Sequence, residues 1–205
     1  MDGFVDIALF RHGLTEANKR YAYLGWTDSP LCPIDKKKIT EVPACYDLIQ
    51  SSDLGRCQQT AKMLFPGNNL ESGIEWREIN FGEWEGRTYE ELKDDAVYQR
   101  WLKDPFSESV PGGETYEVFS ERVDWGWQKL IHRILEKGIR KAALVTHSGV
   151  IRYLLSKHGP EGKEFWEWQI PFGKEYELFW NYEELRRGER CTLLRAAPLM
   201  ESPGG

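Results

Sequence analysis

The sequence predicts an α/β protein with a layered sheet. Apolar runs of strand length alternate with segments of helical periodicity, a pattern typical of strands joined by helices. Two of the apolar runs, residues 5–10 and 142–145, end just before a histidine. In an open α/β sheet, ligands bind in the crevice outside the carboxyl ends of the strands. The pattern therefore also predicts where a functional site lies.

The predicted strands are apolar runs bounded by polar and turn-forming residues. They cover residues 4–10, about 46–51, about 73–77, 142–146, about 175–181 and about 190–196. The last two flank Arg187-Gly188-Glu189, a turn-like stretch, so we expect them to form a hairpin.

The predicted helices cover residues 55–65, 88–102, 115–137 and 149–157. The helix at 115–137 has the clearest periodicity, because apolar side chains recur on one face from Tyr116 to Ile134 and Gly138 suits its end. The helix at 88–102 opens with a capping-box pair, Thr88 and Glu91.

Two further segments are not expected to form a long helix or strand. Residues 31–43 contain Pro33 and Pro43, which exclude a long helix, so we expect a loop or a short helix there. The tail at 202–205 is expected to fray.

Length and composition predict one globular domain over residues 1–205. The formal net charge of −6 argues against a nucleic-acid binder, which normally presents a basic face. No apolar run reaches about 18 residues, so we expect no membrane-spanning helix. The N-terminus lacks the pattern of a signal peptide, and the four scattered cysteines lack metal-ligand spacing. We therefore expect a cytoplasmic protein with free thiols.

The tripeptide Arg11-His12-Gly13 follows the first strand and suits the chemistry of a phosphate ester. An unprotonated imidazole at His12 can attack phosphorus, because histidine titrates near neutral pH and keeps a lone pair. The guanidinium of Arg11 offers a fork of donors that matches phosphate oxygens. Gly13 has no side chain, so nearby backbone N–H groups can approach an anion closely.

Two other residues are placed at predicted helix starts, where anions bind favourably. Arg56 begins the helix at 55–65, and His147 precedes the helix at 149–157. Taken alone, Arg56 is also compatible with a solvated surface arginine, and His147 with a buried structural histidine. A proton donor is needed as well, and composition does not choose among Glu78, Glu83 and Glu85.

Together these pieces resemble the histidine phosphatase superfamily, in the branch that includes the cofactor-dependent phosphoglycerate mutases. The R-H-G motif matches residues 11–13, and the pattern S-x-x-x-R-x-x-x-T-A matches 52–61. The pattern R-E-x-x-x-G-x-W-E-G matches 77–86, and the second H-G-like motif matches 147–149. Four motifs in the right order make the resemblance specific.

The resemblance implies a three-layer α/β/α sandwich with a mixed, mostly parallel sheet, and it implies no metal or other cofactor. It assigns His12 as the residue that becomes phosphohistidine, and Glu78 as the acid and then the base. The residues that it places around the phosphoryl group are Arg11, Asn18, Arg56 and His147.

Two loops are expected to define the substrate. Gly25 and Trp26 are placed near the site as substrate-binding residues, because aromatic rings can stack on a flat base. Taken alone, Trp26 is also compatible with packing in the core or at the rim of the site. The stretch at 111–115, Pro-Gly-Gly-Glu-Thr, resembles a loop of small bacterial phosphatases such as α-ribazole phosphatase, and we expect it to overhang the phosphate.

The resemblance favours a metal-independent phosphomonoesterase acting on a small phosphorylated metabolite. His147 follows Glu78 by only 69 positions (147 − 78), with no added lid of the kind a mutase uses to exclude water. The alternatives are a phosphoglycerate-type mutase and a phosphate-binding module without turnover. The stretch after Leu31 is shorter than in the family, which leaves surface for a partner subunit, and both a monomer and a homodimer remain open.

Overall fold

The computed structural model describes residues 3–43, 45–172 and 174–198. A six-stranded sheet runs through this part of the chain in the order β3-β2-β4-β1-β5-β6. The strands are β1 (Phe4–Arg11), β2 (Leu48–Ser52), β3 (Glu71–Gly73), β4 (Lys141–Thr146), β5 (Lys174–Asn181) and β6 (Leu193–Pro198). The first four are mutually parallel, whereas β5 and β6 are antiparallel to their neighbours, which confirms the mixed, mostly parallel sheet.

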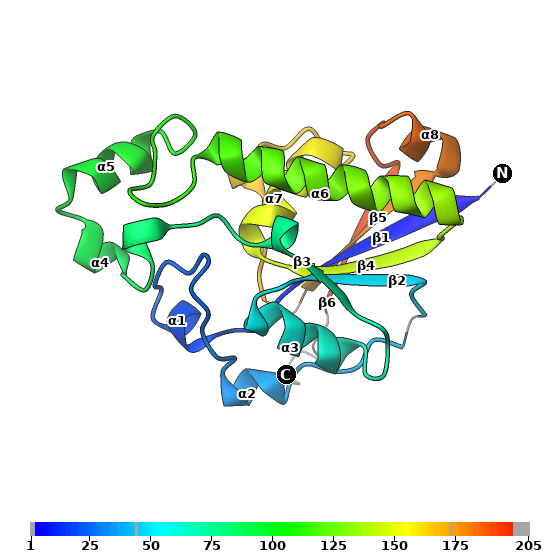
Figure 1. Cartoon of the computed structure of the whole chain (residues 1–205), viewed down its shortest axis with the longest axis horizontal. Coiled ribbons are helices and arrows are strands. Elements are labelled where there is room, and N and C mark those ends of the chain that lie inside the picture. The colour runs from blue at the N-terminus through cyan, green and yellow to red at the C-terminus, as the bar shows by residue number, and fades with distance from the viewer. Residues whose placement is uncertain (1–2, 44, 173, 199–205) are drawn as a thin grey trace.

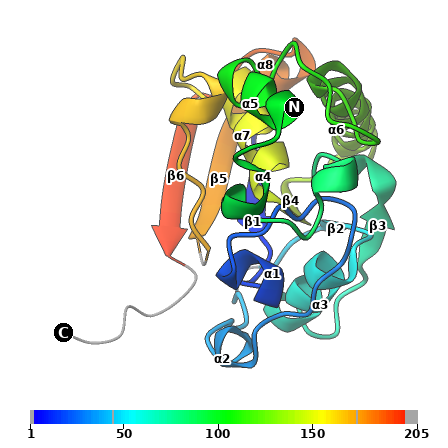
Figure 2. The same cartoon turned by 90° about the vertical axis from the view of Figure 1, so that its left-hand side faces the viewer.

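Helices cover both faces of the sheet, as Figures 1 and 2 show. They are α1 (Glu16–Lys19), α2 (Pro33–Lys36), α3 (Gly55–Leu64), α4 (Tyr89–Leu92), α5 (Ala96–Lys103), α6 (Tyr116–Lys137), α7 (Ser148–His158) and α8 (Tyr182–Arg186). Since α3 lies on one face and α6 and α7 on the other, the three-layer sandwich is confirmed. Among the described residues, no helix is long and apolar enough to cross a membrane.

Successive side chains of β1 point to opposite faces of the sheet, so this strand packs against the helices on both sides. Ile7 and Leu9 pack into the core beneath α6 and α7, whereas Ala8 and Phe10 pack into the core on the α3 side. Both faces of the strand are therefore buried, which is why its sequence is an almost continuous apolar run.

The long helix α6 has the ends that its sequence predicts. The Thr115 hydroxyl accepts a hydrogen bond from the Val118 N–H at the start, and Gly138 adopts a left-handed conformation (φ 66°) at the end. The apolar stripe is buried through Phe119 and Ile134, which fixes α6 firmly on the sheet.

Two predictions in the middle of the chain need correction. The strand expected at 73–77 ends at Gly73 and gives way to a 3-10 helix, Ile74–Trp76, which turns the Trp76 side chain into the core. The helix expected at 88–102 is two helices, because the Asp95 side chain accepts from the N–H groups that begin α5. The capping box at the start of α4 is present.

The last two strands do pair as predicted, but not through a simple hairpin turn. The helix α8 lies between them, begun by an Asn181 cap, and β6 starts at Leu193. The short helix α2 agrees with the prediction for 31–43, while the tail at 202–205 lies outside the described residues.

Candidate active site

The register of the sheet places the two site histidines side by side. β1 and β4 are parallel neighbours, and Arg11 pairs with Thr146 at their carboxyl ends. The next residue of each strand is therefore His12 and His147, and their ring centroids lie 5.0 Å apart. The structure thus brings together two motifs that are 135 residues apart in the chain (147 − 12).

His12 is buried and has a defined tautomer. Its Nδ1 lies 2.8 Å from the carbonyl oxygen of Gly13, which can only accept a hydrogen bond, so Nδ1 carries the proton and Nε2 keeps a lone pair. Burial, together with the positive charges of Arg56 and Arg11, holds the pKa of His12 well below its usual value. The imidazole is therefore neutral at physiological pH, the form a nucleophile requires.

The loop that carries His12 is tied to α3. The Gly13 N–H donates to the Thr60 hydroxyl (3.0 Å), and this hydroxyl donates in turn to the Arg56 carbonyl (2.7 Å). The Gly13 N–H is thus occupied by the protein, and Gly13 contributes by fixing the turn after His12.

His147 precedes the first residue of α7 and is fully buried. Its Nε2 lies 3.0 Å from the Ser52 hydroxyl at the end of β2 and 3.4 Å from the Cys57 sulfur on α3. Burial and the charge of Arg56 lower the pKa of His147 well below its usual value as well. These contacts join the ends of β2, β4 and α3 at one place.

Glu78 lies across the same site and accepts three hydrogen bonds. Its carboxylate accepts from the N–H groups of Ile79 (3.1 Å) and Gly149 (2.9 Å) and from the Ser148 hydroxyl (3.3 Å). The last two donors are at the N-terminus of α7, where a negative charge is favoured. A Cβ at Gly149 would lie 2.1 Å from Glu78 Oε1, so only glycine allows this approach.

A guanidinium on α6 holds the segment that carries Glu78. Arg122 donates to the carbonyls of Glu75 (3.0 Å), Arg77 (3.0 Å) and Glu78 (3.2 Å), and it forms an ion pair with Glu114 (2.7 Å). The sequence offers no local signal for this role, because Arg122 belongs to none of the four motifs.

The two site arginines are also held by the protein. Arg11 donates to the Ile170 carbonyl (2.5 Å) and stacks on Phe172 at 3.6 Å, whereas the buried Arg56 donates to the carbonyls of Gly25 (2.5 Å) and Thr27 (3.0 Å). Each keeps a buried Nε without a hydrogen-bond partner in the part of the chain that the structure describes. Arg56 is thus no solvated surface residue.

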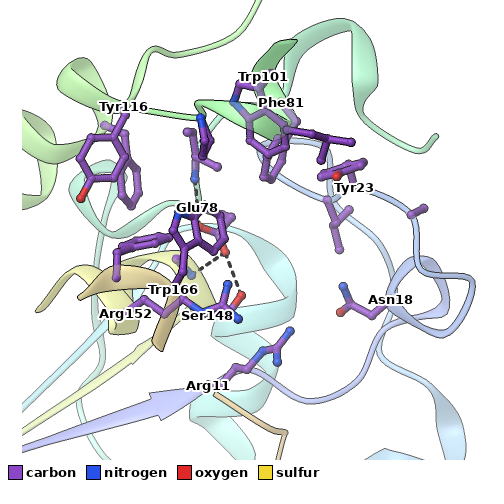
Figure 3. A pocket seen from close by; sticks show the side chains of 18 of the residues that line it. Arg11, Asn18, Tyr23, Glu78, Phe81, Trp101, Tyr116, Ser148, Arg152 and Trp166 are labelled. Atoms are coloured by element: carbon purple, nitrogen blue, oxygen red, sulfur yellow. Dashed lines mark hydrogen bonds between the residues drawn. The ribbon is translucent and has the colours of Figure 1, made fainter. Parts of the chain in front are cut away.

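A cavity of about 330 Å³ opens at this edge of the sheet (Figure 3). Four of the predicted site residues line it: Arg11, His12, Asn18 and Glu78. The other four predicted residues are outside the lining of this cavity: Gly25, Trp26, Arg56 and His147.

Trp26 contacts the Glu78 segment and does not line the cavity. Its indole N–H donates to the Glu78 carbonyl (3.0 Å), and the Arg77 guanidinium lies 4.7 Å from its ring. Gly25 offers its carbonyl to Arg56, and a Cβ there would lie 2.2 Å from the Ile79 carbonyl. In this structure both residues position the polypeptide around Glu78 and Arg56 rather than line the cavity.

The loop at 111–115 likewise contributes no residue to the cavity lining. Its Glu114 carboxylate accepts a hydrogen bond from the Asn80 N–H (2.9 Å) and forms an ion pair with Arg122. The Pro111 carbonyl accepts a hydrogen bond from the backbone N–H of Glu83 (2.9 Å). The expectation that this loop overhangs the phosphate is therefore wrong here, since it braces the Glu78 segment instead.

The residues predicted from the sequence to form the site include neither the cationic Arg152 nor the aromatic Trp166. Arg152 and Trp166 both line the cavity. The guanidinium carbon of Arg152 lies 5.5 Å from the centroid of the Trp166 ring. Arg152 could have been found, because it follows Ser148 by one helical turn and so faces the same way. Among the described residues, no group of three or more His, Cys, Asp or Glu side chains is placed to hold a metal ion.

Comparison with known proteins agrees with this geometry. The profile of the histidine phosphatase superfamily (branch 1) matches residues 7–186. The chain belongs to this superfamily. Membership makes it an enzyme of the histidine phosphatase class.

Relatives within the superfamily differ in their reactions. The adenosylcobalamin/alpha-ribazole phosphatase of Escherichia coli is 29% identical over 177 residues, which cover 80% of this chain and 85% of the relative. A 2,3-bisphosphoglycerate-dependent phosphoglycerate mutase of Cytophaga hutchinsonii is 27% identical, over 76% of this chain and 79% of the relative. The crystal structure of the alpha-ribazole phosphatase from Shigella flexneri superposes with a TM-score of 0.77 at 24% identity, over 85% and 90% of the two chains, and shares the fold.

Proposed function

We propose that the chain is a metal-independent phosphomonoesterase that hydrolyses a small phosphorylated metabolite through a phosphohistidine. The observation that carries this proposal is the state of His12, a buried neutral imidazole whose Nε2 lone pair is left free beside the guanidinium groups of Arg11 and Arg56. A nucleophile next to fixed cations is the arrangement that phosphoryl transfer needs.

In the proposed first step, His12 Nε2 attacks phosphorus and the bond from phosphorus to the ester oxygen breaks. The protonated Glu78 carboxyl gives its proton to that oxygen, so the alcohol leaves neutral. Arg11 and Asn18 at the cavity wall hold the transferring group, while Arg56 and His147, which lie beside His12 outside the lining, stabilise the charge that develops on it.

In the proposed second step, the Glu78 carboxylate takes a proton from water as this water attacks the phosphohistidine. The bond from His12 to phosphorus breaks, inorganic phosphate leaves and Glu78 is protonated again. Glu78 and His12 line the same cavity, and the N–H of Gly149 at the N-terminus of α7 favours the Glu78 carboxylate that this second step requires.

The test is phosphate release from a panel of monoesters in the presence of EDTA, with trapping of the ³²P-labelled protein by an alkaline detergent quench. We expect chelator-resistant hydrolysis and a label that is stable in base and labile in acid. His12→Ala should lose at least about a thousandfold in turnover, since the attacking atom is absent. The exposed His132, which is not part of the site, provides the control as His132→Ala.

The same assay decides against the rival functions. Transfer of the labelled phosphoryl group from the protein back into a bisphosphorylated substrate, without net release of phosphate, would favour a mutase like that of the Cytophaga relative. Binding of phosphate esters without release or transfer would favour a phosphate-binding module.

A further inference from the structure

The site cavity has two ends of opposite chemistry, which Figure 3 shows directly. Its polar end carries Arg11, Asn18, Ser148 and Arg152 around Glu78. The opposite end is built from aromatic rings, with Phe81 and Trp101 on one side and Tyr116 on the other. A phosphate group needs only the polar end, so the aromatic end is available for the rest of the substrate.

One aromatic wall is rigid because its rings pack on one another. Tyr23 lies 5.0 Å from Phe81 and 6.0 Å from Trp101 between ring centroids, and Trp101 is backed by Trp84 at 5.4 Å. The Tyr23 hydroxyl is bonded to the Tyr98 hydroxyl (2.7 Å) and so is already paired within the protein. This wall offers ring surface and few free polar atoms.

The facing wall carries an indole that is exposed and still oriented. Trp166 is 47% exposed, and its ring lies 4.8 Å from Phe165 and 5.5 Å from the Arg152 guanidinium. Arg152 is itself anchored by a hydrogen bond from its Nε to the Trp168 carbonyl (3.0 Å). An indole held above a cation at the polar end is well placed to cover a flat group attached to the phosphate.

We infer that the substrates of this enzyme are monophosphates of alcohols that carry an apolar aromatic ring, and not polyhydroxylated phosphates. The inference rests on the phosphomonoesterase function proposed above. A sugar or glycerol group in this cavity would bury hydroxyls against rings that leave them unpaired, which is unfavourable. An aromatic ring there would instead exchange water for two ring-bearing walls.

The test separates ring recognition from chemistry. Binding of benzylphosphonate and methylphosphonate, which have no ester bond to cleave, is compared by calorimetry. Hydrolysis of 2-phenylethyl phosphate is compared with that of ethyl phosphate and glycerol phosphate, because all three are alkyl esters without the activated leaving group of an aryl ester. We expect at least about tenfold tighter binding and tenfold higher kcat/KM for the ring-bearing compounds, as stacking on one indole supplies about that factor.

Trp166 is the residue to vary, since its exposed side chain can be shortened without opening the core. Trp166→Ala should reduce the preference for the ring-bearing compounds about tenfold in both assays. Trp125→Ala is the matched control, because Trp125 is also exposed (54%), lies on α6 against Lys129, and is absent from the cavity lining. It should leave the preference unchanged.

The outcomes distinguish the two proposals. A preference for benzylphosphonate that Trp166→Ala removes supports the inference even if no ester is hydrolysed, in which case only the phosphomonoesterase function fails. Equal affinity for the two phosphonates, or better hydrolysis of glycerol phosphate than of 2-phenylethyl phosphate, overturns the inference whatever the activity.

Discussion

At the scale of single residues, one backbone carbonyl decides which ring nitrogen of His12 carries the proton. Because the Gly13 carbonyl accepts from Nδ1, the free lone pair is on Nε2, and burial beside Arg56 and Arg11 keeps the ring neutral. The same buried cations that would attract a phosphate group thus also protect the nucleophile from protonation.

This arrangement predicts a histidine ring that stays neutral at unusually low pH. In long-range ¹H–¹⁵N spectra of the free protein, assigned with His12→Asn, the His12 ring should keep its Nδ1–H form from pH 8 down to below 6. Its folded pKa is depressed, so protonation begins only well below the ordinary value of about 6.5. A ring that titrates near about 6.5, or one protonated on Nε2, would contradict the structure.

A second residue-scale prediction concerns the acid. Glu78→Gln should lower kcat/KM about a hundredfold for alkyl phosphates and less than about tenfold for 4-nitrophenyl phosphate, because a poor leaving group depends most on a proton donor. Glu83→Gln is the control, since Glu83 does not line the cavity, and it should behave as the unchanged protein. Equal losses for both esters would remove Glu78 from the role of acid.

The motifs predicted which residues gather here, but not how each is used. His12 and His147 lie side by side as expected, because parallel strands end at one edge and that edge can be identified from apolar runs, and Glu78 lines the same cavity as His12. Trp26 and the loop at 111–115 were expected to contact substrate and instead support Glu78. Side-chain direction in a loop depends on tertiary contacts, which a local sequence pattern does not contain.

At the scale of elements, α6 does more than cover the sheet. Its apolar stripe packs in the core, while Arg122 on a neighbouring turn reaches across to three carbonyls of the Glu78 segment and to the Glu114 carboxylate. A rigid helix of 22 residues is thereby coupled to the position of one carboxylate.

Replacing this guanidinium should therefore impair proton transfer more than binding. Arg122→Lys keeps the charge but loses the fork of donors, and we expect kcat to fall about ten- to a hundredfold with KM nearly unchanged, as charge-assisted hydrogen bonds contribute about 1.5–3 kcal/mol each. The loss should be larger for alkyl than for 4-nitrophenyl phosphate, as in Glu78→Gln.

Arg133→Lys on the same helix is the control for that prediction. Arg133 pairs with Glu71 on the edge strand β3 and is absent from the cavity lining, so its replacement should affect melting temperature without changing kcat. A loss in Arg122→Lys that is equal for both esters would indicate general destabilisation rather than positioning.

Elements with long periodic patterns were predictable, and those set by single caps were not. The boundaries of α6 follow from its stripe and its terminal Thr115 and Gly138. The division between α4 and α5 depends on the Asp95 side chain, and the early end of β3 depends on Trp76 turning into the core. Such local competition is decided by tertiary packing.

At the scale of the whole molecule, the site histidines have a cost for stability that depends on pH. Burial lowers the pKa of His12 and His147 well below the ordinary value, and it lowers that of His158 to about 4. Below about pH 6.5 the unfolded chain therefore binds more protons than the folded chain, and the free energy of unfolding falls as the pH falls.

Two carboxyl groups on the sheet oppose this trend. Burial, assisted by the charge of Glu177, raises the pKa of Asp6 and of Glu175 to about 6. Between about pH 4 and 6 the folded chain holds protons on these groups that the unfolded chain has released, so they favour folding at lower pH.

Near pH 5 the three histidines bind protons in the unfolded chain, and the two carboxyl groups bind protons in the folded chain. The unfolded chain therefore binds about one proton more than the folded chain, so the free energy of unfolding should fall by about 1–2 kcal/mol per pH unit from pH 6 to 5. Urea unfolding at a series of pH values measures this slope. Asp6→Asn removes one opposing group and should steepen it, whereas His158→Gln should flatten it. A stability that is level or rises as the pH is lowered from 6 to 5 would show that the buried histidines are not neutral in the folded chain.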